Sequence, residues 1–486
     1  MKKIFATNLV LLLTLNLLVK PFWIFGIDRA VQNAVGAGEY GLFFALFNFS
    51  LLLNIILDFG ITNFNNREIS RHAQMLPRFF SNMITIKLLM ATAYFIVTFV
   101  IAFIIGYSSR QFWILGFLVF NQFLSSLILY FRSNISGLQL FKTDSILSVT
   151  DRVLMIILCA FLLWGPVRDQ FHIEWFVYAQ TVAYVATAII AFLLVLKQSQ
   201  FFTPKFDLRF FITIVKRSYP YALLVLLMSF YYRVDSVMLE RMLPDGNVQS
   251  GIYAQAFRLL DAANMVPFLF ASLLLPIFSK MIKTNEPVKS LLGFSFSLLF
   301  VFSFVVSVVC ITFRNEIMSI LYVHHSDQSS IILATLMVSF IFISMSYIFG
   351  TLLTANGSLK HLNIISFSGV IVNVILNLIL IPKYYAVGAA VASLATQMVV
   401  VLFQILISCK KFSVKFDFKR VMPYIYFVAF TVLSVFMLYK HLPNGVLTFM
   451  LSLIVPALFS FLIGIISIKE VFGMFVTSSS TVNSEE

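Results

Sequence analysis

Long apolar runs separated by short polar segments follow one another along nearly the whole chain. A helix needs about 20 apolar residues to cross roughly 30 Å of hydrocarbon, and runs of that length recur throughout the sequence. We predict fourteen membrane-spanning helices, at 5–26, 41–62, 80–105, 111–133, 144–165, 172–196, 213–242, 250–279, 288–313, 329–354, 361–382, 385–408, 419–440 and 444–468. The connecting segments are too short to hold a soluble domain.

The composition supports a membrane protein. Hydrophobic residues make up 60% of the chain and charged residues only 11%, whereas a soluble domain has about 25% charged residues. A soluble protein of this length could not bury so much apolar surface, because its exterior must carry charge. We therefore predict an all-α integral membrane protein with about fourteen transmembrane helices.

The beginning of the chain resembles a secretory signal peptide. Two lysines precede an apolar core in "MKKIFATNLVLLLTLNLLVK". However, no small-residue cleavage site follows, because Lys20 is succeeded by Pro21 and then by "FWIFG". We predict an uncleaved first membrane span.

Basic residues are distributed unequally between the two sides of the membrane. If the N-terminus is cytoplasmic, the inner segments hold 22 of the 34 Lys and Arg residues and the outer segments hold seven. This arrangement follows the positive-inside rule. An even number of spans places both termini in the cytoplasm, and twelve spans would satisfy this condition as well as fourteen.

Several charged residues lie inside predicted spans, where each costs about 2.5–3.5 kcal/mol at a helix centre. Their depths below the outer surface follow from a rise of about 1.5 Å per residue. Five charges on three spans then fall in one layer of the outer half, at depths of about 9–16 Å: Lys20, Arg233, Asp235, Arg258 and Asp261. The layer has three positive and two negative charges, and we expect it to be a functional site.

Helix geometry limits how these charges pair. Arg233 and Asp235 are two residues apart and point in nearly opposite directions, whereas Arg258 and Asp261 are three apart and share a face. Asp235 could pair with Arg258, or Arg233 with Asp261. One interpretation is one or two interhelical salt bridges. The other is a water-filled central cavity with surplus positive charge, which suits an anionic head group. We expect Arg233 to face the cavity and Asp235 to face a neighbouring helix.

Four other charges lie nearer the cytoplasmic ends of their spans. For Lys87, Asp151 and Arg152 we favour snorkelling towards the surface over a role in lining the cavity. Asp58, near the inner end of the second span, could cap a helix or titrate during a transport cycle, and we favour the structural role.

Motifs for nucleotide hydrolysis and metal binding are missing from the sequence. No G-x-x-x-x-G-K-[ST] phosphate loop occurs. The adjacent His324 and His325 are best interpreted as a solvated pair in a loop, and the three cysteines have no metal-ligand spacing. We expect no cofactor, no metal and no nucleic acid partner, and we do not expect an enzyme.

A faint internal repeat occurs at an offset of about 210 residues. "EYGLFFALFNF" (39–49) and "QSGIYAQAFRL" (249–259) align Gly41 with Gly251 and Phe43 with Tyr253. Transporters are commonly built from repeated halves. We therefore predict an N-terminal lobe with spans 1–6, a C-terminal lobe with spans 7–12, and two further spans with a short cytoplasmic tail, at 1–200, 201–412 and 413–486 respectively.

Three sequence blocks carry a family resemblance. The block at 355–393 contains Asn373 and Asn377 followed by "IPKYYAVGAA", the block at 231–281 contains "YYRVDSVML" and "SGIYAQAFRLLDAANMVP", and the third lies at 38–61. Together they resemble Wzx-type oligosaccharide flippases of the multidrug/oligosaccharidyl-lipid/polysaccharide (MOP) exporter superfamily, over essentially the whole chain.

The resemblance implies two six-helix bundles facing a central cavity, with two additional helices at the C-terminus. It also implies that a polyprenyl-diphosphate-linked glycan moves from the inner to the outer leaflet of a bacterial inner membrane. Lys20, Arg233 and Arg258 would bind the anionic head group. Asp235, Asp261 and Asp58 would pair with these charges or carry a coupling proton or sodium ion. We expect a monomer.

Two other function classes compete with this interpretation. A drug or cation antiporter of the same superfamily should have a cavity of acidic character, and the surplus of bases in the outer layer argues against it. A membrane glycosyltransferase or polymerase usually has a large outer loop with catalytic residues, and the longest outer loop here, at 314–328, is short.

Overall fold

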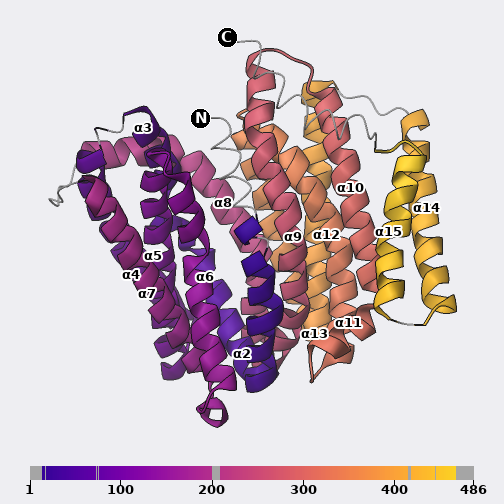
Figure 1. Ribbon diagram of the computed structural model, residues 1–486, viewed down its shortest axis with the longest axis horizontal. Coiled ribbons are helices and arrows are strands. Elements are labelled where there is room, and N and C mark those ends of the chain that lie inside the picture. Colours follow the sequence, from indigo (N-terminus) through magenta and orange to yellow (C-terminus); the bar gives the residue numbers. More distant parts are fainter. Residues whose placement is uncertain are drawn as a thin grey trace. The chain divides into compact units, whose positions relative to one another are not determined.

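The computed structural model describes residues 14–16, 18–72, 74, 76–199, 208–413, 418–443 and 445–466. All the regular elements in these ranges are helices, which confirms the predicted all-α class (Figure 1). The beginning of the predicted first span, the join between the two predicted lobes and the predicted cytoplasmic tail lie outside the described residues.

The helices follow the predicted spans closely from the third span onward. The elements in chain order are η1 Trp23–Asp28, α2 Arg29–Leu52, η2 Asn54–Leu57, α3 Ile61–Arg71, α4 Leu76–Ile105, α5 Ser109–Gly137, α6 Phe141–Trp164, η4 Arg168–Gln170, α7 Ile173–Ser199, α8 Leu208–Met242, α9 Gly246–Lys283, α10 Lys289–Thr312, α11 Arg314–Leu321, α12 Ser326–Ala355, α13 Leu359–Phe412, α14 Phe418–His441 and α15 Val446–Leu462.

Among the described residues, eleven helical stretches are long and apolar enough to span a membrane. Two of them contain a non-helical residue, Gly36 and Tyr385, at which the chain turns back. In α13, Lys411 Nζ donates to Ser358 Oγ at 2.7 Å although the residues are 53 apart in sequence. Each of these two stretches therefore counts as two spans, and the shorter apolar helix α15 adds one more. The predicted number of about fourteen is confirmed.

The first two spans have different limits from those predicted. The first does not end at residue 26, because helical structure continues through η1 and α2 to the turn at Gly36. With a rise of about 1.5 Å per residue, Lys20 is about 24 Å from this turn. It therefore does not share a layer with Arg233, and Asp28, about 12 Å from the turn, lies at that depth instead.

The second span also ends earlier than predicted. Helix α2 stops at Leu52 rather than continuing to residue 62, and a break separates it from α3. Phe59 and Gly60 within this break have positive φ angles of 39° and 82°. The apolar sequence "LLLNIIL" (51–57) continues from the end of α2 into the break, which explains why hydropathy alone predicted an uninterrupted helix.

The chain divides into two compact units. The first consists of the described parts of Met1–Gln255 with Leu321–His325, and the second of those of Ala256–Ile320 with Ser326–Glu486. The boundary falls inside α9. The division into lobes 1–200 and 201–412 with a 413–486 extension stays a prediction.

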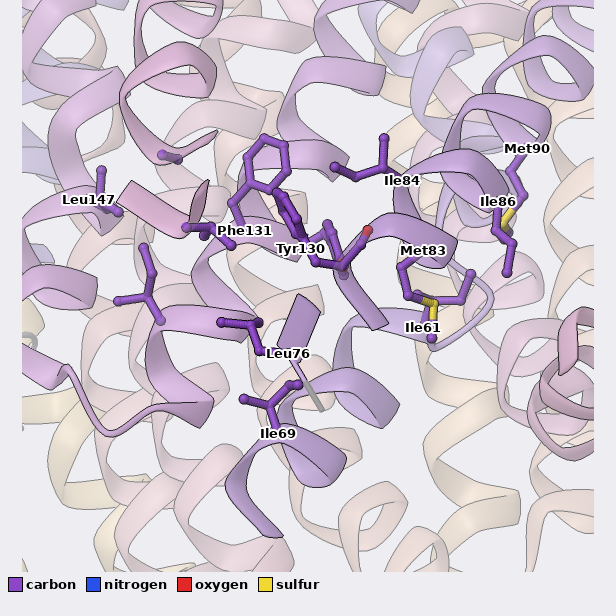
Figure 2. Packing of buried hydrophobic residues seen from close by; sticks show 14 residues of the cluster. Ile61, Ile69, Leu76, Met83, Ile84, Ile86, Met90, Tyr130, Phe131 and Leu147 are labelled. Atoms are coloured by element: carbon purple, nitrogen blue, oxygen red, sulfur yellow. The ribbon is translucent and has the colours of Figure 1, made fainter. Parts of the chain in front are cut away.

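Each unit has its own apolar core. In the first, buried side chains of α3, α4, α5, α6 and α7 form one cluster, which includes Tyr130, Phe131 and Leu147 (Figure 2). In the second, α14 and α15 pack against α10, and the rings of Phe430 and Phe459 stack 3.8 Å apart. Lipid offers helices no hydrophobic driving force to associate, so close packing of this kind holds membrane helices together.

Candidate functional site

Arg233 lies on α8 with its guanidinium directed at α2. Its Nη1 donates to Asn48 Oδ1 at 2.8 Å, and the guanidinium carbon is 5.6 Å from the ring centre of Tyr232. Helices α2 and α8 pack side by side in the first unit. Because Asn48 is neutral, it orients the guanidinium without cancelling its charge.

Asp235, two residues further along α8, is held by a different helix. Its side chain is buried and accepts a hydrogen bond from the Tyr253 hydroxyl of α9 at 3.0 Å. Arg233 is more exposed than Asp235. The two side chains contact different helices, as their spacing requires. The assignment of Arg233 to the cavity stays a prediction.

A second buried carboxylate, Asp28, was missed by sequence reasoning. It is 1% exposed and accepts hydrogen bonds from the Tyr40 hydroxyl at 2.8 and 2.9 Å and from Gln32 Nε2 at 3.3 Å. A straight helix would separate residues 28 and 40 by about 18 Å, so this contact also shows the chain reversal at Gly36. The predicted end of the first span at residue 26 placed Asp28 in a loop. The match between Ile27-Asp28 and Val234-Asp235, close to the repeat offset, could have revealed it.

The two glycines aligned by the internal repeat lie at a very close helix crossing. A methyl group on Gly41 of α2 would overlap the backbone of Asn247 and Gly251, and one on Gly251 of α9 would overlap the backbone of Ala37. Residues 37 and 247, like 41 and 251, differ by 210 positions. The contact is therefore built from equivalent positions of the two repeats, which supports the repeat itself.

Arg258 and Asp261 lie further along α9, in the second unit. Arg258 Nη1 is 3.7 Å from Asp261 Oδ2, and the two side chains are partly exposed. Their three-residue spacing places them on one face, as predicted. Asp261 thus lies next to a cation that was expected to bind substrate.

Lys20 is half-buried in the first unit, beside α6 rather than in the layer predicted for it. The charged side chains near it include Arg152, Asp151 and Arg132. One turn earlier, Asn16 Nδ2 donates to Ser148 Oγ of α6 at 3.0 Å. Lys20 is therefore part of a polar contact between the first helix and α6.

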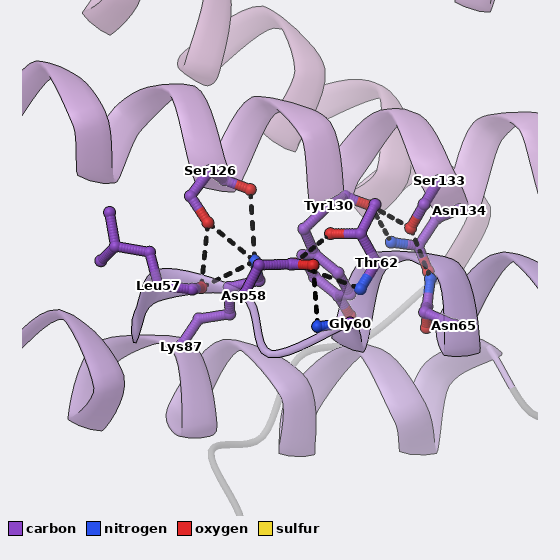
Figure 3. Close-up of polar contacts among 10 residues, drawn as sticks. All are labelled: Leu57, Asp58, Gly60, Thr62, Asn65, Lys87, Ser126, Tyr130, Ser133 and Asn134. Carbon is purple, nitrogen blue, oxygen red and sulfur yellow. Dashed lines mark hydrogen bonds and ion pairs between the residues drawn. The ribbon is translucent and has the colours of Figure 1, made fainter. Parts of the chain in front are cut away.

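Asp58 and Lys87 form an ion pair at the break between α2 and α3 (Figure 3). Lys87 Nζ lies 2.7 Å from Asp58 Oδ1 and also donates to Leu57 O at 3.1 Å and Ser126 Oγ at 2.8 Å. The snorkelling predicted for Lys87 is wrong, since the side chain is 1% exposed. The break leaves a backbone carbonyl of Leu57 inside the protein, and Lys87 bonds to it.

The other side of Asp58 stabilises the beginning of α3. Its carboxylate accepts hydrogen bonds from the backbone N–H groups of Gly60 and Thr62, both at 3.2 Å, and from the Thr62 hydroxyl. A carboxylate is favourable at a helix N-terminus. Asp58 therefore makes the contacts of a helix cap, and a part in ion coupling stays a prediction.

Comparisons with known proteins agree on the fold. The chain is similar to the lipid II flippase MurJ in an inward closed conformation, with 16% identity, a TM-score of 0.71, and coverage of 94% of this chain and 98% of MurJ. It is also similar to a multidrug resistance MATE family transporter of the MOP superfamily in an inward-facing conformation, with 14% identity, a TM-score of 0.65, and coverage of 80% and 94%. A third similar structure is a mutant of the Vibrio cholerae MATE transporter VcmN, with 12% identity, a TM-score of 0.58, and coverage of 84% of this chain and 97% of that protein.

These likenesses establish that the helices have the arrangement found in MOP transporters. No curated protein sequence matches the chain. The sequence profile described as "Polysaccharide biosynthesis protein" matches residues 6–282, which is more than half of the chain. The chain therefore belongs to the polysaccharide biosynthesis protein family of multi-pass membrane proteins.

Proposed function

We propose that the protein moves a polyprenyl-diphosphate-linked oligosaccharide from the cytoplasmic to the outer leaflet of a bacterial inner membrane by alternating access. The translocated glycan serves surface polysaccharide assembly. Membership of the polysaccharide biosynthesis family and the fold shared with a lipid II flippase support the proposal. The protein acts as a monomer with both termini in the cytoplasm.

Arg233 provides the main support at the level of single residues. A cation inside a membrane helix is costly, and here a neutral amide, Asn48, fixes its orientation. Such a guanidinium is suited to bidentate binding of a phosphate group. In the proposed function Lys20 and Arg258 supply further positive charge, while Asp235, Asp261 and Asp58 pair with these cations or carry a coupling proton or sodium ion.

The second candidate is an ion-coupled multidrug or cation antiporter. The observation that favours it is the presence of two buried carboxylates, Asp28 and Asp235, each 1% exposed and bonded to a tyrosine. The MATE transporters share the fold. A cationic substrate would bind at such acids and would be repelled by Arg233.

Replacing the arginine and replacing its amide partner test the proposal in cells that depend on this protein for surface glycan. Arg233→Gln should lower export about tenfold or more, because a charge-assisted hydrogen bond is worth about 1.5–3 kcal/mol. Asn48→Asp keeps Arg233 but gives it a carboxylate partner, so export should fall as well. Arg110→Gln, the same change at an exposed position, is the matched control.

Membrane insertion must be verified for each variant by its yield and its elution profile in detergent. Normal glycan export by inserted Arg233→Gln and Asn48→Asp proteins would refute the flippase assignment. If the same variants instead alter resistance to cationic drugs while glycan export is unchanged, the antiporter is the correct function.

A further inference from the structure

The connection between α4 and α5 and the connection between α8 and α9 border one cavity in the first unit. The cavity has a volume of about 380 Å³ and is open to the surface. Most of the residues that line it are polar, and they include Ser108, Gln111, Glu240, Arg241 and Asn247. In the topology of the proposed function, both connections face the outside of the membrane.

Gln111, in the first turn of α5, positions two charged side chains at the end of α8. Its Nε2 donates to Glu240 Oε1 at 2.7 Å, and its Oε1 accepts a hydrogen bond from Arg241 Nη2 at 3.0 Å. The same Oε1 accepts from the backbone N–H of Ser108 at 2.8 Å, as part of the capping box of α5. The helix cap therefore also fixes the carboxylate and the guanidinium in the cavity wall.

Glu240 and Arg241 keep hydrogen-bonding capacity after these contacts. Arg241 Nε donates to Glu240 Oε2 at 2.7 Å, and its guanidinium carbon is 4.4 Å from the ring centre of Tyr107. A guanidinium has more N–H groups, and a carboxylate more acceptor positions, than these bonds occupy. The Arg241 side chain is 27% exposed and so remains accessible. The cavity thus presents N–H donors and carboxylate acceptors side by side.

The charged side chains that line the cavity have partners of opposite charge. Arg241 is paired with Glu240. Arg110, at the edge of the cavity, is paired with Glu39 and Glu174, neither of which lines it. Among the described residues, the cavity therefore offers an ion no unpaired opposite charge. An uncharged ligand with many hydrogen-bonding groups suits it better than an anion or a cation.

Sugar hydroxyls match this arrangement of donors and acceptors. A hydroxyl group both donates and accepts a hydrogen bond, so neighbouring hydroxyls of one ring can accept from Arg241 and donate to Glu240. Leu42 and Leu243 also line the cavity and provide apolar surface for the C–H groups of the ring. Small-molecule sites measure about 300–1,000 Å³. The cavity is at the lower end of this range and therefore has room for a small part of a glycan only.

We propose that this cavity binds an uncharged sugar unit of the exported glycan at the outer surface of the membrane. Glu240 and Arg241 bind the hydroxyls of the ring, and Gln111 is a positioning residue that holds both side chains. The inference rests on the proposed function and adds a contact for the glycan to the contact of Arg233 with the head group. The cavity selects for the sugar, whereas Arg233 binds the phosphate whichever sugar it carries.

Saturation-transfer NMR on the full-length protein in lipid nanodiscs tests the binding. The probes are the methyl glycosides of glucose, galactose, rhamnose and N-acetylglucosamine, which imitate a glycosidically linked unit. The methyl glycoside of glucuronic acid is the charged comparison. We expect saturable binding of at least one uncharged glycoside. The glucuronide should bind at least about tenfold more weakly, because its carboxylate would lie beside that of Glu240.

Two pairs of variants locate the binding at the cavity. Glu240→Gln should weaken it about tenfold, because hydrogen bonds to a charged acceptor are stronger than those to a neutral one. Glu286→Gln, the same change at an exposed position between α9 and α10, is its control. Asn247→Phe should obstruct the cavity and abolish binding, and it should lower glycan export in cells. Asp245→Phe, at an exposed position that does not line the cavity, should change neither.

The possible results separate the sugar site from the proposed function. If no uncharged glycoside binds, or if one binds equally well to Asn247→Phe, the sugar site is refuted, while loss of export in Arg233→Gln still supports the flippase. Stronger binding of the glucuronide refutes an uncharged ligand. If Asn247→Phe abolishes glycoside binding but leaves export unchanged, the cavity binds free sugars and the link to the exported glycan is refuted. Because the wild-type titration requires no substitution, the test holds even if Glu240→Gln does not fold.

Discussion

The two hairpins that begin the repeats share a scaffold. The first reverses at Gly36, and the second connects α8 to α9. In each, an aspartate, Asp28 or Asp235, is 1% exposed and accepts a hydrogen bond from a tyrosine on the returning helix. The aligned glycines of the two hairpins touch the opposite backbone. The repeated features, an aspartate–tyrosine hydrogen bond and a close glycine contact, are those that hold the helices together.

The hairpins differ in where they carry positive charge. Two residues before its aspartate, the second hairpin has Arg233, where the first has Gly26. In the first hairpin, Lys20 lies eight residues before Asp28, on the helix that contacts α6 through Asn16, and Arg29 directly follows Asp28. The returning helices differ too, since α2 ends at Leu52 whereas α9 continues to Lys283. The repeated scaffold thus carries positive charge at two different depths.

The break in α2, which α9 lacks, should be the most sensitive feature of the first hairpin. Lys87→Met removes a buried cation that bonds to Asp58, Leu57 and Ser126. Breaking one partner out of a buried pair costs about 3–5 kcal/mol. We expect the free energy of unfolding in detergent to fall by about this amount, measured by denaturant titration.

The double variant Lys87→Met with Asp58→Asn distinguishes the effect of an unpaired charge from the effect of losing the lysine side chain. Removing both charges should recover part of the loss, because no uncompensated carboxylate remains. Lys280→Met, at an exposed position of α9, is the matched control and should have little effect. A double variant as unstable as the sum of its two single variants would show that the ion pair does not stabilise the break.

The second-largest loss of stability should come from changes at the crossing of Gly41 and Gly251. Gly251→Ala places a methyl group against the backbone of Ala37, and Gly41→Ala places one against Asn247. Backbone cannot rotate aside like a flexible side chain, so the helices must separate. Overpacking of this kind costs about 1–3 kcal/mol, and we expect both variants to lose thermal stability by a similar amount in detergent.

Gly293→Ala in α10 is the control for this comparison. No atom lies within 4 Å of a methyl group added there, and alanine is favoured over glycine in a helix by about 0.5–1 kcal/mol. It should therefore be neutral or stabilising. Unequal effects of Gly41→Ala and Gly251→Ala would mean that the two repeats do not contribute equivalently to the crossing.

The sequence was sufficient to predict the helices wherever apolar length decided the outcome. The spans from the third at 80–105 onward required only the rule of about 20 apolar residues per crossing, and the turn at Tyr385 falls on the first residue of the predicted span 385–408. The same rule failed where polar residues interrupt an apolar helix, because it ended the first span too early. Asp28 and Gln32 fell in a predicted loop, because Tyr40, which donates to Asp28, becomes adjacent to it only when the chain reverses.

The sequence predicted which charged residues lie inside the membrane helices, but it predicted less well which side chains each of them contacts. Spacing along one helix correctly separated Arg233 from Asp235 and placed Arg258 beside Asp261. Contacts between helices depend on rotation and depth, which a sequence does not specify. The sequence therefore assigned Lys20 to the layer of Arg233, whereas the structure places it beside Arg152. It also predicted Lys87 at the surface, whereas the ammonium group bonds to the Leu57 carbonyl at the break between α2 and α3.

The two tyrosines test whether the shared scaffold is equally important in both hairpins. Tyr40→Phe and Tyr253→Phe each remove a hydroxyl that donates to a buried aspartate. A hydrogen bond to a charged group contributes about 1.5–3 kcal/mol. Since Asp28 keeps its bond from Gln32, we expect a loss towards the lower end of this range for Tyr40→Phe, and a loss within the range for Tyr253→Phe. Thermal unfolding of both variants measures the two losses, and an unchanged unfolding temperature in either variant would show that the tyrosine of that hairpin does not stabilise it.

The smallest effect should come from an ion-pair network in the first hairpin. Glu39 pairs with Arg110, which also pairs with Glu174, at 2.5 and 2.7 Å. The equivalent of Glu39 in the second hairpin is Gln249, which bonds locally to Asp245. The Arg110 side chain is 49% exposed, and exposed ion pairs contribute about 0.2–1 kcal/mol.

Arg110→Gln should therefore lower the free energy of unfolding by less than about 1 kcal/mol. Salt screens exposed charges, so the difference from the wild type should shrink when unfolding is repeated at high salt. The Lys87→Met difference should persist, because that ion pair is buried. A salt-insensitive loss at Arg110 as large as that at Lys87 would show that the outer network, and not the buried pair at the α2 break, is the main stabilising feature peculiar to the first hairpin.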